Sequence, residues 1–351
     1  MRILFSESKQ YYVNLGLKPL DTFEFNGMNF YKSIDIDDYD AFVCSNFLIP
    51  HSLIISEIFQ KNSKKTILVS DGIFDFANAF KNPMHKKYDI DLYFPVLQNY
   101  FITADVECHD YFKNQVSVSS YRPKHMIKKE EVITVPMRQR ALITTANTAY
   151  FDKQEFLNLK DLIVSSIHLL RLKGIDFDLR IYDKGLLEQV LNTVDFDINN
   201  VIGGDFESVL NSYSFVITTP SSISVTSMYH QRPVISLITR TNPTSIQTGW
   251  NVSNSEQLEN SILDIKSNVG SGLKQQNLLL NKYLSELDLN TALKNILNDD
   301  LEVQRKIHTN KILIKMLRSK FNFNVEFIIR NLYLKLRGFY FVKLMRKKIS
   351  W

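Results

Sequence analysis

The chain has 351 residues, of which 44% are hydrophobic and 23% charged, and its formal net charge at pH 7 is +5. This composition excludes an intrinsically disordered chain, and at about 150 residues per domain the length predicts two domains. Cys44 and Cys108 are too few for a disulfide framework, and no run of about 18 uncharged apolar residues predicts a membrane-spanning helix.

Short apolar runs alternate with helical patterns along the first 120 residues. Buried strands are predicted at Ile3–Phe5, Ala41–Cys44, Thr66–Ser70 and Phe101–Ala104, and helices at Ser52–Gln60 and near Glu107–Lys113. This alternation is typical of a parallel sheet covered by helices. We therefore expect an α/β domain of the Rossmann type over residues 1–120.

The hydrophobic periodicity fades after Val116, and the sequence becomes polar and basic with Pro123 and Pro136. Residues 121–139 are therefore the predicted interdomain linker. Strands are predicted again at Ala141–Thr145, Asp178–Tyr182, Phe215–Thr218 and Pro233–Leu237, with helices at Leu157–Lys173, Leu186–Leu191 and Phe206–Asn211. A second Rossmann-like domain is expected over residues 140–300, followed by a helical tail over 301–351.

The tail is basic and rich in aromatic residues. Between Arg318 and Lys348 it carries nine Lys or Arg and one acid, Glu326. Such a helix can lie on an anionic membrane surface, or it can pack on a neighbouring domain with its lysines in water. No nucleic-acid module accompanies the charge, so we expect no nucleic-acid partner. Because the N-terminal run lacks the apolar centre of a signal peptide, we expect a cytoplasmic protein that the tail holds at the inner face of the membrane.

The segment from Phe215 to Ile235 predicts a buried strand, a hydroxyl-rich turn, a helix and another strand. Ser221 and Ser222 stand where that helix begins. Backbone N–H groups without helical partners and the positive end of the helix dipole favour an anion at this place, and two hydroxyls add donors. The pattern predicts a phosphate site. A serine that only caps the helix would give the same pattern.

A carboxylate follows the strand predicted at Thr66–Ser70. Asp71 and Gly72 come at its carboxyl end, where doubly wound folds collect their ligands. A transfer to a hydroxyl needs a base, and a carboxylate at a domain cleft can serve. Asp71 is the candidate base and Asp75 the reserve, although an Asp-Gly turn after a strand also occurs without any catalytic role.

The serine turn and its flanking strands resemble the nucleotide-binding half of GT-B glycosyltransferases that use CMP-activated acidic sugars, namely sialyltransferases, polysialyltransferases and Kdo transferases. The resemblance covers mainly residues 141–265. It implies two Rossmann-like domains facing a central cleft, with C-terminal helices, and an inverting, metal-independent transfer onto a bacterial surface glycan such as capsule or lipopolysaccharide. Related patterns occur in teichoic-acid polymerases and sugar-nucleotide epimerases.

The resemblance also implies which residues contact the donor: Thr144, Thr145, Asn147, Lys184, Thr219, Ser221 and Ser222. The chain departs from the family at two places. Ser70 stands where the family has the first acidic residue before Asp-Gly. A His-Pro pair is missing after the strand Asp178–Tyr182, and Lys184 remains there as the cation for the donor phosphate.

No metal or bound cofactor is expected, and the nucleotide-sugar would be a co-substrate. Asp-x-Asp pairs recur without a common setting, the histidines lack metal-ligand spacing, and no Gly-rich dinucleotide motif or Gly-x-Ser-x-Gly elbow is present. A CMP-linked Kdo or sialic acid is the favoured donor. The alternatives are a UDP- or GDP-sugar transferase, a glycerol-phosphate polymerase using His230, a sugar-nucleotide epimerase, or a non-catalytic scaffold of polysaccharide assembly.

Overall fold

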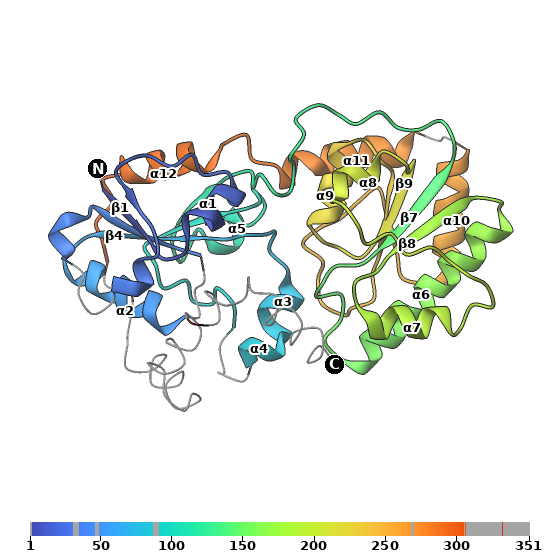
Figure 1. The fold of residues 1–351 in the computed structure, drawn as a ribbon, viewed down its shortest axis with the longest axis horizontal. Coiled ribbons are helices and arrows are strands. Elements are labelled where there is room, and N and C mark those ends of the chain that lie inside the picture. Colours follow the sequence, from blue (N-terminus) through green and yellow to red (C-terminus); the bar gives the residue numbers. More distant parts are fainter. Residues whose placement is uncertain are drawn as a thin grey trace.

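The computed structural model describes residues 2–30, 35–45, 49–86, 91–267 and 270–304, together with Lys306 and Leu332. These residues form two α/β bodies that lie side by side, each built on one parallel sheet (Figure 1). The basic segment 318–348, which is expected to lie on a membrane, is outside the described residues apart from Leu332. No helix in the described part of the chain is both long and apolar enough to cross a membrane.

The first sheet has the strand order β2-β1-β3-β4-β5-β6, and every neighbouring pair is parallel. Its strands are β1 Ile3–Phe5, β2 Phe23–Glu24, β3 Ala41–Cys44, β4 Lys65–Val69, β5 Tyr100–Thr103 and β6 Ser117–Ser120. The helices of this half are α1 Lys9–Leu15, α2 Pro50–Lys61, α3 Phe76–Lys81, α4 Pro83–Lys86 and α5 His109–Phe112, with short 3-10 turns at Gly27–Phe30 and Ile36–Asp38. The strands β1, β3 and β5 are buried along their whole length, as expected for a parallel sheet with two covered faces.

The second sheet has the order β11-β10-β9-β7-β8 and is also parallel throughout. Its strands are β7 Arg140–Thr144, β8 Asp176–Arg180, β9 Phe215–Thr218, β10 Val234–Leu237 and β11 Trp250–Val252. The helices are α6 Lys153–Leu172, α7 Lys184–Leu191, α8 Phe206–Leu210, α9 Ser222–Tyr229, α10 Ser255–Lys266, α11 Ser271–Tyr283 and α12 Leu289–Leu297. Acidic or amide side chains accept from backbone N–H groups at several helix starts, namely Asp152, Asp183, Asp205, Asn254 and Asp288.

The α/β class predicted from the sequence is confirmed. β1, β3 and β9 have the predicted bounds, and the other predicted strands differ by two residues at most. Strand β6 lies in the stretch where periodicity fades, because it is a polar edge strand, Ser117-Val-Ser-Ser, with only Ser120 buried. The short edge strands β2 and β11 also have no clear signal in the sequence.

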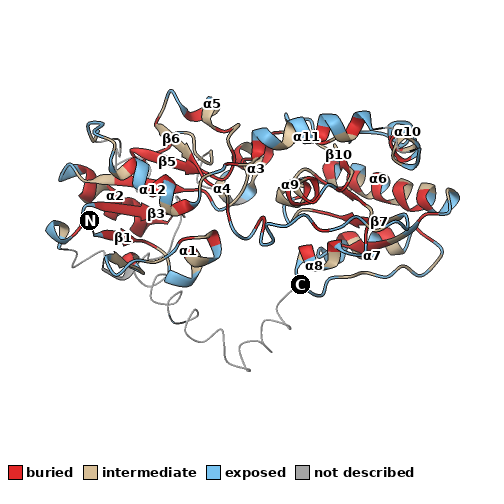
Figure 2. Cartoon of the chain, turned by 90° about the horizontal axis from the view of Figure 1, so that it is seen from above, coloured by how far each residue is buried: buried red, intermediate tan, exposed pale blue. Residues whose placement is uncertain are grey.

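The two halves share a hydrophobic core. Helix α12 packs on β5 and β6, although it follows the second sheet in sequence and falls within the 140–300 segment. One core cluster joins Val69 and Ile102 of the first sheet to Val225 and Met228 of α9. Figure 2 shows buried residues along both sheets and along the inward faces of the helices that cover them. Because apolar burial is non-directional and cumulative, this shared cluster holds the two halves together.

The segment after Met126 is held on the second half by buried polar groups. The Ile133 N–H donates to His230 Nδ1 at 3.2 Å, and His230 Nε2 lies 3.1 Å from Glu207 Oε1. Glu207 also accepts from the backbone N–H groups of Lys128 and Lys129. Since Nδ1 accepts a bond, the ring proton of neutral His230 lies on Nε2 and is donated to Glu207. This part of the linker is therefore fixed to the second half.

The neutral state of His230 predicts an acid-sensitive stability. Burial lowers the pKa of His230 below its usual value of 6.5, so the unfolded chain binds this proton more readily than the folded one. The stabilisation is then complete above pH 6.5 and is lost as the pH falls below it. We expect the free energy of unfolding, measured with urea, to fall by about 1 kcal/mol from His230 alone between pH 7.5 and 5.5.

The control for this effect is His230→Gln, because burial also lowers the pKa of His85, His109 and His125. The variant should be less stable at pH 7.5 and should lose less stability on acidification than the wild type. If the free energy of unfolding fell equally with pH in the two proteins, the pH dependence would belong to the other histidines.

Candidate functional site

The second sheet reverses its direction of growth between β7 and β9. From β7 the chain adds β8 on one side, then returns to add β9, β10 and β11 on the other. In open parallel sheets, ligands bind outside the carboxyl ends of the strands at such a switch point. The loops after β7, β9 and β10 therefore mark the expected binding place in this half.

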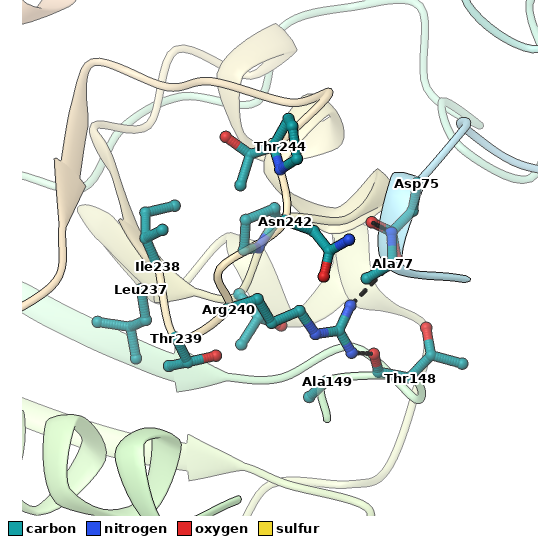
Figure 3. Close-up of a pocket in the computed structure, with 13 residues that line it drawn as sticks. Asp75, Ala77, Thr148, Ala149, Leu237, Ile238, Thr239, Arg240, Asn242 and Thr244 are labelled. Carbon is teal, nitrogen blue, oxygen red and sulfur yellow. Dashed lines mark hydrogen bonds and ion pairs between the residues drawn. The ribbon is translucent and has the colours of Figure 1, made fainter. Parts of the chain in front are cut away.

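A pocket lies at that switch point. It is a small hollow that opens to solvent, and Figure 3 shows side chains from both halves around it. The loops after β7, β9 and β10 form most of its wall, and the start of α3 closes it from the first half. The lining residues are Asp75, Ala77, Thr148, Ala149, Thr219, Pro220, Leu237, Ile238, Thr239, Arg240, Asn242, Pro243 and Thr244.

Arg240 is the cation of this pocket. Its Nη1 donates to Asp75 Oδ2 at 3.1 Å and its Nη2 donates to the Thr148 carbonyl. Its Nε lies 3.4 Å from Glu155 Oε2, and its guanidinium carbon lies 4.7 Å from the centre of the Phe151 ring. The dashed lines in Figure 3 mark the bonds to Asp75 and Thr148. One arginine thus joins both halves at the pocket wall.

The turn before α9 lines the pocket beside Arg240. Thr219 and Pro220 line the pocket, and the Thr219 hydroxyl accepts from the Ala146 N–H at 2.8 Å. Ser221 is the N-cap residue by backbone geometry, but its side chain makes no cap hydrogen bond. Its buried Oγ has no hydrogen-bond partner among the described residues. Ser222 is the first residue of the helix and is half-buried.

The first sheet also has a switch point, between β1 and β3, and polar side chains gather there. The Glu7 carboxylate accepts from Ser6 Oγ, Tyr12 Oη and, at 3.2 Å, the Ser45 N–H. Tyr11 Oη lies 2.7 Å from Ser45 Oγ. These residues follow β1 and β3 or belong to α1, so the same rule that places the pocket marks this cluster as a second binding place.

Asp71 belongs to the edge of this cluster. It is exposed, it follows β4, and its Oδ2 accepts from Tyr11 Oη at 3.4 Å. Burial, followed by the charge of Asp71, raises the pKa of Tyr11, so Tyr11 stays protonated and keeps donating. Burial lowers the pKa of His125, and the nearby Asp71 charge partly offsets this shift. The chain continues from Asp71 to Phe74, whose carbonyl accepts from Ser245 Oγ of the second half.

Asp75 has a different setting. Its carboxylate caps α3, accepting from the Ala77 N–H at 3.2 Å and the Asn78 N–H at 3.1 Å, and it also pairs with Arg240. These three contacts fix the carboxylate between the start of α3 and Arg240. The structure thus places Asp75 in the pocket as a counter-ion.

Asp75 and Thr219 are the two sequence-predicted site residues that line the pocket. Ser221 and Ser222 adjoin it through Pro220. Thr144 and Thr145 are buried below it, and Thr144 Oγ1 donates to the Arg180 carbonyl at 2.9 Å. The pocket lining does not include Asp71, Asn147 or Lys184. All three are exposed: Asp71 follows β4, Lys184 begins α7, and Asn147 lies in the loop after β7, next to the lining residue Thr148.

Sequence reasoning missed Arg240, Glu155 and Asn242. Arg240 and Asn242 come three and five residues after the predicted strand Pro233–Leu237, so the rule that selected Asp71 could also have selected them. Glu155 stands three residues after the N-cap Asp152, a pattern that predicts a capping role. It does accept from the Phe151 N–H at 2.8 Å, but it also faces Arg240 and Lys81.

His230, the histidine that a phosphate polymerase would use, is fully buried in the linker contact described above. It does not line the pocket. Within the described ranges, no group of three or more His, Cys, Asp or Glu side chains could hold a metal ion.

No protein-family model and no curated protein matches this sequence, whereas solved structures resemble it. The S. aureus protein MnaA, solved with UDP, is 11% identical and has a TM-score of 0.55, with 92% of this chain and 99% of that chain covered. The UDP-GlcNAc 2-epimerase from Neisseria meningitidis, bound to UDP-GlcNAc, is 9% identical with a TM-score of 0.55, covering 85% and 100%. CalG4, the calicheamicin glycosyltransferase, has a TM-score of 0.41 at 10% identity, covering 73% and 72%. The chain therefore has the GT-B type of fold, two Rossmann-like domains that together span nearly the whole of the MnaA and Neisseria structures.

Proposed function

We propose that this chain binds a nucleotide-sugar in the pocket at the switch point of the second sheet and transfers the sugar to an acceptor hydroxyl. The observation that carries the proposal is the pairing of two switch-point sites. A pocket with a cation and a helix start lies in one half. A polar cluster with the carboxylates of Glu7 and Asp71 lies at the corresponding edge of the other half.

The donor phosphate would bind at the start of α9. The helix has eight residues, and its first N–H groups and dipole favour an anion. The Ser221 hydroxyl is available as a further donor, since it makes no cap bond. As the glycosidic bond to the phosphate breaks, these groups would stabilise the charge that develops on the leaving group. Asp71 would take the proton of the acceptor hydroxyl, and the transfer would be inverting and would need no metal.

Uridine is the base that we propose for the donor. The similar MnaA and Neisseria structures hold UDP and UDP-GlcNAc, which supports the UDP alternative better than the CMP-linked acidic sugar favoured by the sequence. For the acceptor we keep the bacterial surface glycan that the family resemblance implies.

A thermal-shift series with UDP, CMP, GDP and TDP tests the proposal. A ligand that binds only the folded state raises the melting temperature, by about 4 °C at one hundred times its Kd for a protein of this size. We expect UDP to give the largest shift. Ser222→Ala should reduce that shift, whereas Ser255→Ala, at the first position of the distant helix α10, should leave it unchanged. Equal shifts in the two variants would leave Ser222 without a role in binding, and no shift with any nucleotide would refute the proposal.

A sugar-nucleotide epimerase is the second candidate. The observation that favours it is that the structural alignment with the Neisseria epimerase covers 100% of that protein and 85% of this chain. An epimerase would convert UDP-GlcNAc in the absence of any acceptor, whereas a transferase would need one. NMR of UDP-GlcNAc incubated with the purified protein alone therefore separates the two activities.

A further inference from the structure

Arg240 contacts residues of both halves, and these partners differ in how easily a ligand could replace them. On the side of the second half, Glu155 is buried, with its side chain 5% exposed, and its Oε2 already accepts from the Phe151 N–H. The Thr148 carbonyl and the Phe151 ring hold the guanidinium on the same side. On the side of the first half, the partner of Arg240 is Asp75, whose side chain is 34% exposed.

Asp75 does not depend on Arg240 for its hydrogen bonds. Its two carboxylate oxygens accept from the N–H groups of Ala77 and Asn78 at the start of α3. If Arg240 turned to another anion, Asp75 would stay capped by the backbone and in contact with water. Glu155 would keep Lys81 and the Phe151 N–H, but it is buried, so the loss of Arg240 would cost it more than it costs the partly exposed Asp75. Asp75 is thus the partner that can leave.

The pocket also contains polar atoms that the protein does not satisfy. Asn242 Oδ1 is buried without a hydrogen-bond partner among the described residues, and Arg240 Nε has the 3.4 Å ion pair with Glu155 but no hydrogen bond there. Both residues line the same cavity. Buried polar atoms are normally hydrogen-bonded, so the Asn242 oxygen in the cavity wall points to a ligand with a hydrogen-bond donor, such as a sugar hydroxyl beside the diphosphate.

The charges around the cavity are balanced only while Asp75 is present. Arg240 and Lys81 face Asp75 and Glu155, with Lys81 Nζ 3.4 Å from Glu155 Oε1. Withdrawal of Asp75 leaves two cations against one acid. The pocket then carries an excess positive charge at Arg240, beside the turn that leads into α9.

We propose that Arg240 binds the diphosphate of the donor and that Asp75 is a resident counter-ion, which the ligand displaces. The inference rests on the proposed nucleotide-sugar function and specifies it: the ligand class is a nucleoside diphosphate, whose charge competes with the carboxylate at α3. Lys81 Nζ to Thr241 Oγ1, at 3.5 Å, and Ser245 Oγ to the Phe74 carbonyl still join α3 to the second half when Asp75 is displaced. The exchange therefore sets affinity without separating the halves.

The deciding variant is Asp75→Asn. Asparagine caps helices as well as aspartate does, so α3 is kept while the competing charge is removed. We expect isothermal titration at fixed ionic strength to show about fivefold tighter binding of UDP and of inorganic pyrophosphate, with uridine unchanged. Asp288→Asn is the matched control, because Asp288 also caps a helix and lies 4.0 Å from a lysine, Lys18, but belongs to α12. It should bind all three probes as the wild type does.

Arg240→Gln should weaken UDP and pyrophosphate at least tenfold and leave uridine unchanged. If its folding fails, Arg240→Lys should show an intermediate loss, because lysine keeps the charge but not the forked geometry.

Unchanged or weaker pyrophosphate binding in Asp75→Asn overturns the inference, as does the absence of pyrophosphate binding in both this variant and the wild type. If pyrophosphate binding responds to Asp75→Asn while UDP binds no better than pyrophosphate, the anion site stands and the nucleotide-sugar function falls.

Discussion

Asp71→Asn should lower the rate of glycosyl transfer about a thousandfold and leave the Kd for UDP unchanged. The amide cannot accept the proton of the acceptor hydroxyl, and general base catalysis typically contributes a factor of about 100 to 10,000. Asp71 is suited to this role because it is exposed beside the polar cluster of the first sheet and accepts one long hydrogen bond, from Tyr11 at 3.4 Å. The measurement is a transfer assay at saturating donor, with Kd from titration calorimetry.

The control for this variant is Asp21→Asn, which changes an exposed acid of the same half, in the turn before β2. It should transfer at the wild-type rate. Full activity of Asp71→Asn would remove Asp71 as the base and would direct attention to Glu7, the other carboxylate of the cluster.

Arg232→Met should reduce the free energy of unfolding by at least about 3 kcal/mol, because a buried acceptor left without its donor costs about 1–3 kcal/mol and several carbonyls lose theirs. Arg232 is fully buried, and burial lowers its pKa to about 10, so it is charged at neutral pH. Its guanidinium donates to five backbone carbonyls, those of Leu210, Tyr213, His230, Ile133 and Thr134. The last two belong to the linker, so the variant should also loosen the linker from the second half.

Urea unfolding of Arg232→Met is compared with that of Arg171→Met. Arg171 is exposed near the end of α6, with its guanidinium carbon 4.1 Å from the centre of the Phe196 ring, and its loss should cost under about 1 kcal/mol. Arg232→Lys should also be destabilising, because an ammonium has three donors and cannot reach all five carbonyls. Similar losses in the Arg232 and Arg171 variants would contradict the assignment of a linker anchor.

The roles of Asp71 and Asp75 illustrate what a sequence can and cannot distinguish. Both follow β4, four residues apart, and the sequence offers them as first and reserve base. The structure separates them by their partners. Asp75 caps α3 and pairs with Arg240, whereas Asp71 faces the polar cluster of the first half. Nothing in the local sequence announces the ion pair, because Arg240 lies 165 positions away.

The pattern of apolar and polar residues was enough to assign the α/β class and most of the elements. Continuous apolar runs such as Phe215–Thr218 are buried on both sides of a sheet, and that burial depends on composition within a few residues. It also determined that the turn before α9 begins a helix at the end of a strand.

The tertiary structure alone decided the strand order, and with it the two switch points at which the pocket and the Glu7 cluster lie. It also decided that α12 returns to the first sheet and that Arg240 meets Asp75. The physical reason is that these features depend on contacts between residues far apart in the chain, where packing and charge pairing select partners that no local periodicity records.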